Sequence, residues 1–158
     1  MSISAVTPAD LPALLDIQRA AFQKEADQYG DCSIPPLRQT VEDLRADLAT
    51  KTFIKATDDD GQLIGSIRAY AENGVCHLEK LSVYPAHQRR GHGAQLLLAV
   101  EKEFPRVTHF ELFTGQLSAD NIRLYQKLGY RTVREEKISC RLMLLHMQKE
   151  RNQPAPTS

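Results

Sequence analysis

The segment HLEKLSVYPAHQRRGHGAQLLLAVEKEF, residues 77–104, holds the sharpest change of pattern in the chain. Its first eight residues are typical of a strand, in which successive side chains point to opposite faces. One face would carry Glu79, Leu81 and Val83, and the other Leu78, Lys80 and Ser82. Pro85 lacks the N–H that a sheet ladder needs, so the strand is expected to end before it. From residue 93 onward apolar side chains recur at helical spacing, which predicts a helix after a short loop.

The loop Gln88-Arg89-Arg90-Gly91-His92-Gly93 has the chemistry of an anion-binding site. A helix N-terminus leaves backbone N–H groups without partners, and the helix dipole adds partial positive charge there. Gly91 and Gly93 permit a left-handed backbone and a close approach of a ligand. A diphosphate would accept hydrogen bonds from the amides of residues 88–94, and Arg89 and Arg90 would add positive charge on the solvent side.

Other interpretations of this loop are open. A Walker A loop requires G-x-x-x-x-G-K-[ST], and the chain contains no such run. A dinucleotide-binding G-x-G-x-x-G would use Gly91 and Gly93, but Leu96 stands where the third glycine belongs. Glu111 does lie twenty residues after Gly91, as that fingerprint asks, yet a tight hairpin feeds the preceding strand and the motif sits mid-chain. A glycine-punctuated turn with solvated arginines is the purely structural alternative.

A second group of residues, from Asn121 to Tyr130, follows a later strand. Asn121, Leu124, Tyr125 and Leu128 are spaced so that they share one face of a helix. Tyr125 is therefore either the large member of an apolar stripe or a positioned phenol.

The remaining signals predict the order β-α-α-β-β-β-α-β-α-β-β, a mixed sheet with helices on both faces. Asn73-Gly74 is a strong hairpin signal between two strands. The pair Pro35-Pro36 is expected to exclude helix from the loop of residues 29–37. We expect a single domain over residues 1–148 and a flexible polar tail over residues 149–158.

Composition narrows the class of protein. The 158 residues carry a net charge of zero, which argues against a nucleic-acid partner, and no apolar run is long enough to span a membrane. Without a secretory signal pattern, the cytoplasm is the expected location. The three scattered cysteines, Cys32, Cys76 and Cys140, show no metal-ligand spacing, so no metal site is expected. Buried or otherwise structural roles are expected for all three.

Both motifs resemble the GNAT (GCN5-related) N-acetyltransferases. Gln88-x-x-Gly91-x-Gly93 matches the family's Q/R-x-x-G-x-G/A loop, and Leu81 to Pro85 is similar to the strand that leads into it. The segment from Asn121 to Tyr130 resembles the family's N-x-x-x-x-Y-x-x-x-G-F/Y segment. The resemblance covers nearly the whole chain. It implies an α/β (α+β) fold of GNAT type, with a mixed, mostly antiparallel sheet of about seven strands and helices on both faces.

The resemblance also implies acetyl-CoA as co-substrate, with no metal. Residues 88–94 would hold its diphosphate: Gln88, Arg89, Arg90, Gly91, His92, Gly93 and Ala94. The strand residues Leu81, Ser82 and Val83 would offer backbone groups to the pantetheine arm, as one strand does to another. Asn121 would contact that arm or order the helix start, and Thr114 would line the cofactor slot or cap its strand.

For the chemistry, the resemblance makes Tyr125 the acid that protonates the departing thiolate. The acceptor amine needs a base, for which Glu79 is the candidate, with Glu111 weaker; a solvated or paired carboxylate is the bland alternative. Lys80, if it faces the cleft, would favour an acidic group on the acceptor. By position alone, the loop residues Tyr29, Ile34 and Leu37 are candidates for the acceptor pocket.

The function expected from the sequence is therefore transfer of an acetyl group to a primary amine of a small molecule or peptide, by direct transfer. A catalytically silent acyl-CoA-binding regulatory module is the alternative. Family members often dimerise, so a homodimer is open.

Overall fold

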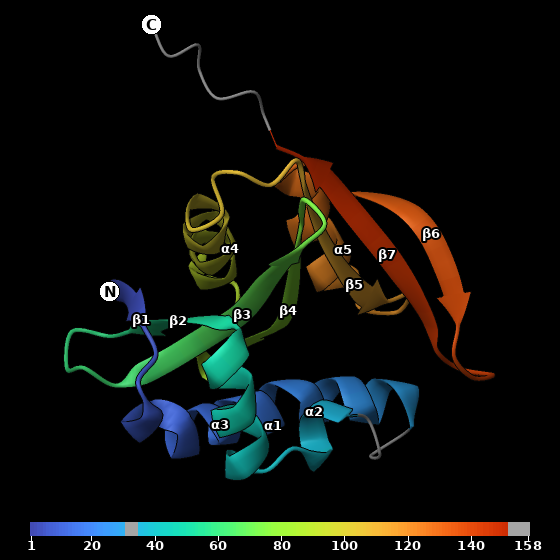
Figure 1. Ribbon diagram of the computed structural model, residues 1–158. Coiled ribbons are helices and arrows are strands. Elements are labelled where there is room, and N and C mark those ends of the chain that lie inside the picture. Colours follow the sequence, from blue (N-terminus) through green and yellow to red (C-terminus); the bar gives the residue numbers. More distant parts are fainter. Residues whose placement is uncertain (31–34, 152–158) are drawn as a thin grey trace, which may run out of the picture.

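The computed structural model describes residues 1–30 and 35–151, and its elements follow the predicted order with one short α-helix, α2, and two 3-10 helices, η1 and η2, added (Figure 1). In chain order they are β1 (Ser2–Ala5), η1 (Pro8–Asp10), α1 (Leu11–Tyr29), α2 (Pro35–Arg38), α3 (Val41–Thr50), β2 (Thr52–Thr57), β3 (Leu63–Glu72), β4 (Val75–Val83), η2 (Pro85–His87), α4 (His92–Lys102), β5 (His109–Gly115), α5 (Ala119–Lys127), β6 (Arg131–Lys137) and β7 (Met143–Glu150).

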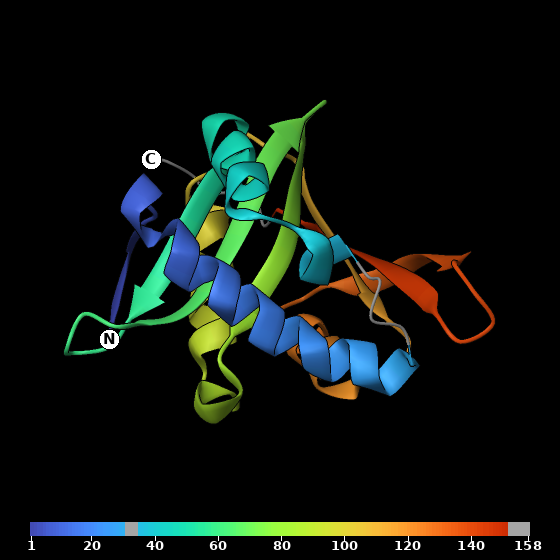
Figure 2. The same cartoon turned by 90° about the horizontal axis from the view of Figure 1, so that it is seen from below.

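The seven strands form one sheet in the order β1-β2-β3-β4-β5-β7-β6. Every neighbouring pair is antiparallel except β4 and β5. Helices α1 to α3 cover one face and α4 lies on the other, as the two views show (Figures 1 and 2). The predicted fold class, a mixed and mostly antiparallel sheet with helices on both faces, is confirmed.

Two apolar cores hold the layers together. The larger packs α4 and α5 against the sheet around Leu96, Leu97 and Tyr125. The smaller joins α1 and α3 to β2 around Leu14, Leu44 and Phe53. Because strand side chains alternate, Phe53 and its neighbour Ile54 belong to different cores.

Sequence signals explain several ends and turns. Asn73 and Gly74 both adopt positive φ, 53° and 80°, as expected for the hairpin between β3 and β4. Thr40 caps α3: its hydroxyl accepts from the Asp43 amide at 3.2 Å, and the Asp43 carboxylate accepts from the Thr40 amide at 2.8 Å.

The central pair β4 and β5 is joined over a short length only. The parallel register runs from Val75↔His109 to His77↔Glu111. Beyond it, β5 stays paired with β7 as far as Gly115, and β4 stays paired with β3. The middle of the sheet is therefore unpaired where β4 leads toward α4.

A β-bulge in β4 corrects the alternation expected from the sequence. Ser66 pairs with Ser82 but Arg68 pairs with Glu79, so β4 contains one residue more than β3 in this interval. Lys80 lies in the bulge with a φ of 54°. The prediction that Glu79 shares a face with Leu81 and Val83 is wrong, because the extra residue reverses the alternation: Leu81 and Val83 join the core beneath α4, while Glu79 pairs with Lys51 at the end of α3.

Two boundaries also differ from expectation. Pro35 and Pro36 were expected to exclude helix, yet they begin α2. The first turn of a helix needs no intrahelical N–H donors, so prolines are tolerated there. Strand β7 continues to Glu150, which pairs with His109, so regular structure extends two residues into the segment expected to be a tail.

Candidate active site

Two adjoining cavities lie along the open middle of the sheet. The loop cavity, of about 350 Å³, lies between α1, the segment of residues 87–94 and the start of α5. The sheet cavity, of about 370 Å³, is lined by β4 residues 78–81, β5 residues 112–115 and side chains from α1, α2, α5 and β7. Four residues line both: Phe22, Glu25, Leu81 and Asn121. These four mark the junction of the cavities.

The loop cavity contains the N-terminus of α4, where the sequence predicts an anion site. Gly91 is the N-cap of α4 with a φ of 85°, and the first intrahelical bond runs from the Gln95 amide to the Gly91 carbonyl at 3.1 Å. The amides of the first turn therefore have no partner within the helix. The Gln88 side chain donates to the Val83 carbonyl at 2.9 Å, which braces the loop against the end of β4.

The packing around Gly93 also favours a residue without a side chain. A Cβ on this residue would lie 3.1 Å from Leu124 Cδ2 and 3.7 Å from Leu81 Cδ2. A side chain at this position would require the Leu124 side chain to shift by a few tenths of an ångström. Glycine therefore allows the closest approach of α4 to α5 beside the loop cavity.

Most predicted loop residues line the loop cavity: Val83, Gln88, Arg89, Gly91, His92, Gly93 and Ala94. Arg90 is exposed and lies outside this lining. Ser82 also lies outside this lining. Its buried hydroxyl donates to the Lys80 carbonyl at 3.1 Å, inside the bulge. Arg89 is mostly exposed and pairs with Asp120 at 3.0 Å across the cavity mouth.

Tyr125 projects from α5 into the sheet cavity and is 5% exposed. Burial, with a smaller contribution from the Glu25 carboxylate, raises the pKa of its phenol well above the usual range. The hydrogen bonds formed by tyrosine hydroxyls among the described residues are those of Tyr29 and Tyr130. Tyr125 is therefore a protonated phenol at neutral pH and is available as a donor.

Thr114 presents an unsatisfied hydroxyl at the same cavity. It lies near the end of β5 and is 5% exposed, and its Oγ1 has no hydrogen-bond partner among the described residues. A buried hydroxyl without a partner costs about 1–3 kcal/mol. A polar group of a bound ligand would remove that penalty.

Glu25, on α1, is the residue that sequence reasoning missed. It lines both cavities. Burial raises the pKa of its carboxyl, and only a long hydrogen bond from Ser118, 3.5 Å, opposes this. Phe22, Glu25 and Tyr29 share one helix face, so a carboxylate within that apolar stripe was the available signal.

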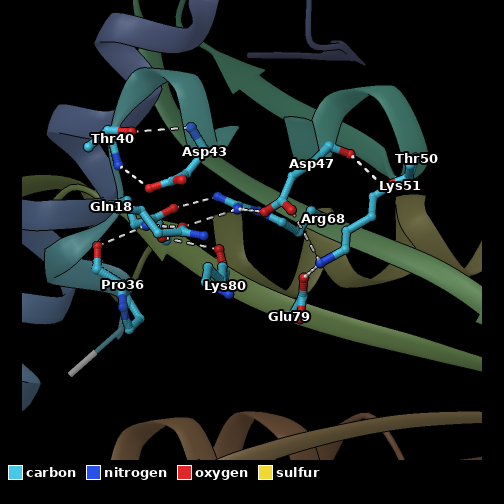
Figure 3. Close-up of polar contacts among 12 residues, drawn as sticks. Gln18, Pro36, Thr40, Asp43, Asp47, Thr50, Lys51, Arg68, Glu79 and Lys80 are labelled. Atoms are coloured by element: carbon cyan, nitrogen blue, oxygen red, sulfur yellow. Dashed lines mark hydrogen bonds and ion pairs between the residues drawn. The ribbon is translucent and has the colours of Figure 1, made fainter. Parts of the chain in front are cut away.

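Glu79 belongs to a charge cluster formed by Asp47, Lys51, Arg68 and Glu79 (Figure 3). Lys51 Nζ lies 2.5 Å from Glu79 and 3.6 Å from Asp47, and Arg68 lies 2.9 Å from Asp47. Arg68, only 1% exposed, also donates to Gln18 on α1. The cluster ties α1 and α3 to the sheet, and it places Glu79 at the edge of the sheet cavity.

Of the residues predicted for the acceptor pocket, Tyr29 lines the sheet cavity and Leu37 does not. Tyr29 lines the sheet cavity, and its buried hydroxyl accepts from the Leu117 amide at 2.9 Å and contacts Ser118 Oγ at 3.2 Å. These contacts fasten α1 to the turn after β5. Leu37 lies in α2 outside the cavity lining, where Pro35 and Pro36 line it instead. Ile34 lies outside the described residues.

Metal and membrane sites find no support in residues 1–30 and 35–151. These residues include no group of His, Cys, Asp or Glu side chains that would hold a metal ion. Likewise, no helix among them has the length and apolar character needed to cross a membrane.

Burial raises the pKa of the Cys76 thiol to about 12, so it is protonated at neutral pH. Cys140 is exposed, and Cys32 lies outside the described residues.

Comparison with solved structures supports the fold. Ribosomal-protein-alanine N-acetyltransferase from Brucella melitensis has a TM-score of 0.79 at 21% identity, over 95% of this chain and 99% of that one. PaiA N-acetyltransferase from Thermoplasma acidophilum, in complex with coenzyme A, has a TM-score of 0.77 at 20% identity, over 96% and 100%. A phosphinothricin acetyltransferase of the GNAT superfamily from Sinorhizobium meliloti, in complex with acetyl-CoA, has a TM-score of 0.77 at 16% identity, over 99% and 94%.

Among curated protein sequences, none matches the chain. At the level of families, residues 11–130 match the GNAT family of acetyltransferases. This match covers most of the chain, including α1, the loop of residues 88–94 and α5, and it agrees with the geometry of the two cavities. The chain belongs to the GNAT acetyltransferase family.

Proposed function

We propose that this protein is an acetyl-CoA-dependent N-acetyltransferase that moves the acetyl group directly to a primary amine of a small molecule or peptide. The observation that carries the proposal is the meeting of the two cavities. The anion-binding loop lines one, Tyr125 lines the other, and Glu25 and Asn121 line both.

The residues present fit the cofactor. The amides of residues 88–94 hold the diphosphate, Arg89 adds positive charge at the cavity mouth, and the exposed Arg90 adds charge from the solvent side. Leu81, Ser82 and Val83 offer backbone groups to the pantetheine arm in the unpaired middle of the sheet. The Thr114 hydroxyl and Asn121 add polar contacts at the inner end. Bound there, acetyl-CoA supplies an activated acetyl thioester.

Proton transfers fall to the side chains at the junction. An alkylammonium must lose a proton before its nitrogen attacks. Glu25 is suited to accept that proton, because burial raises the pKa of its carboxyl. Glu79 remains a candidate base, although its carboxylate is engaged in an ion pair with Lys51. The Tyr125 phenol donates its proton to the departing sulfur.

The test is release of coenzyme A from acetyl-CoA in the presence of a panel of primary amines. We expect release that depends on the amine, and loss of most of the rate in Glu25→Gln or in Glu79→Gln, whichever removes the base. Binding of acetyl-CoA with a raised melting temperature but no turnover on any amine would favour a silent regulatory module. Protection by NAD(H) and not by coenzyme A would contradict the assignment of the loop.

A further inference from the structure

Lys80 is the cation of the sheet cavity, and its position comes from the bulge in β4. A β-bulge next to a cavity re-aims a side chain, and Lys80 holds a left-handed φ of 54°, which is strained for a residue with a Cβ. The strand would be more regular without it. The strain is retained at a residue that lines the sheet cavity.

Lys80 has no carboxylate of its own among the described residues. Its surroundings are the charge cluster, where Glu79 is paired with Lys51 and Asp47 with Arg68 (Figure 3). With Lys80 included, three cations stand against two carboxylates. Burial lowers the pKa of the Lys80 ammonium, and the charges of Arg68 and Lys51 act in the same direction, whereas those of Glu79 and Asp47 oppose it. An anionic group of a ligand beside Lys80 would stabilise its charged form.

The sheet cavity contains an anionic and a cationic side chain that lack a close ion-pair partner among the described residues. Glu25, whose charge acts on the Tyr125 phenol, lines the cavity at the junction, and Lys80 lines the sheet cavity but not the loop cavity. Glu79 also lines the sheet cavity but is paired with Lys51. The rest of the lining is mostly apolar and includes Ile67, Leu78, Ile138, Leu142 and Leu144. A volume of about 370 Å³ is in the range of small-molecule sites.

On this basis, which rests on the proposed function, we infer that the acceptor is an amino carboxylate with an aliphatic body. Its ammonium group lies toward Glu25 and Tyr125, and its carboxylate pairs with Lys80. Lys80 is thus a specificity-determining residue that separates amino acids from simple alkylamines.

The experiment compares acceptors in pairs that differ by one carboxylate: leucine with isopentylamine, γ-aminobutyrate with propylamine, and ε-aminocaproate with pentylamine. We expect kcat/KM to favour the carboxylate member of at least one pair by about tenfold to 100-fold, the worth of a hydrogen-bonded charge pair. In Lys80→Met that ratio should fall toward one, and Lys80→Arg should keep most of it. Lys102→Met, at the exposed end of α4, is the matched control that keeps the full ratio.

Equal rates within every pair, or a ratio that survives Lys80→Met, would overturn this inference while leaving the acetyltransferase assignment intact. Absence of coenzyme A release with every amine would instead contradict the proposed function. In that case calorimetric titration of the coenzyme A complex with the same pairs still decides the matter, because the inference requires tighter binding of the carboxylate member.

Discussion

The loop cavity and the sheet cavity are built in different ways. One continuous segment, residues 87–94, supplies much of the loop cavity, and its binding groups are backbone amides and glycines. The sheet cavity is assembled from short runs of β4 and β5 together with side chains from α1, α2, β3, α4, α5, β7 and the segment between β6 and β7. The loop cavity thus depends mainly on local backbone, whereas the sheet cavity depends on side chains brought together from distant parts of the chain.

The largest effect is expected where the two cavities cooperate. Tyr125→Phe removes the proposed proton donor, so kcat should fall by about 100-fold to 10,000-fold. Coenzyme A affinity and stability should change little, because the substitution removes one oxygen atom and keeps the buried ring. Steady-state kinetics and calorimetry measure both.

Tyr130→Phe is the matched control for that variant. The Tyr130 hydroxyl donates to Glu101 at 2.8 Å, so its loss should lower stability and leave kcat unchanged. Full activity in Tyr125→Phe would mean that another group protonates the sulfur.

The next largest effect tests the wall of the sheet cavity. Arg68→Met leaves the Asp47 carboxylate without its buried partner, so the free energy of unfolding should fall by about 3–5 kcal/mol. Urea denaturation measures this. Arg45→Met, in an exposed pair with Glu42, should cost less than about 0.5 kcal/mol. Equal losses in the two variants would show that the charge cluster does not hold α3 to the sheet.

Tyr29→Phe tests how the two cavities are connected through the contact between α1 and the turn after β5. It leaves the Leu117 amide without its acceptor and should lower stability by about 1–3 kcal/mol. The KM for the acceptor should rise because Tyr29 lines the sheet cavity, and the KM for acetyl-CoA should rise with it because Leu117 and Ser118, which lose their contacts with the Tyr29 hydroxyl, line the loop cavity. Tyr84→Phe, directly after β4, is the control. A change confined to the KM for acetyl-CoA would assign Tyr29 to the wrong cavity.

Gly91→Ala makes the reciprocal test on the loop cavity. At a φ of 85° an added Cβ meets nothing within 4 Å, so its effect is conformational and worth about 1–2 kcal/mol. We expect coenzyme A to bind roughly tenfold more weakly, since relieving the strain would misalign the loop amides. Gly61→Ala has the same open space at a φ of 80°, in the turn between β2 and β3, and should leave coenzyme A binding unchanged. Equal binding losses in both variants would point to general destabilisation.

The smallest effect concerns Glu25. Its pKa is higher in the folded than in the unfolded chain, so the folded state binds more protons between those two values and loses stability as pH rises through them. That loss persists at neutral pH. Glu25→Gln should therefore be slightly more stable than wild type at neutral pH, with the gain disappearing below the ordinary carboxyl range. The free energy of unfolding at neutral pH and below the ordinary carboxyl range measures this gain, with Glu42→Gln as an exposed control. A Glu25→Gln variant that is less stable than wild type at neutral pH would contradict the burial of this charge.

The sequence predicted what local patterns control. The hairpin at Asn73-Gly74 and the glycine loop both depend on neighbouring residues, and each lies where expected. The bulge at Lys80 could not be predicted, because it arises from how β4 pairs with β3. That one extra residue moved Glu79 away from the face of Leu81 and Val83.

The positions of the residues on the acceptor side were also hard to predict, because they depend on contacts between distant parts of the chain. Glu25 reaches the junction only because α1 crosses the sheet beside α5, and its sequence neighbours give no hint of Tyr125. Tyr29 was predicted to line the acceptor pocket from its position in the chain, yet its hydroxyl accepts a hydrogen bond from the Leu117 amide in the turn after β5. Long-range contacts of this kind leave no periodicity in the sequence.

The most direct measurement is a crystal structure of the protein with coenzyme A. The account predicts the diphosphate on the amides of residues 88–94, and the sulfur within hydrogen-bonding distance of Tyr125 Oη. A diphosphate bound elsewhere, or a sulfur beyond the reach of Tyr125, would contradict it.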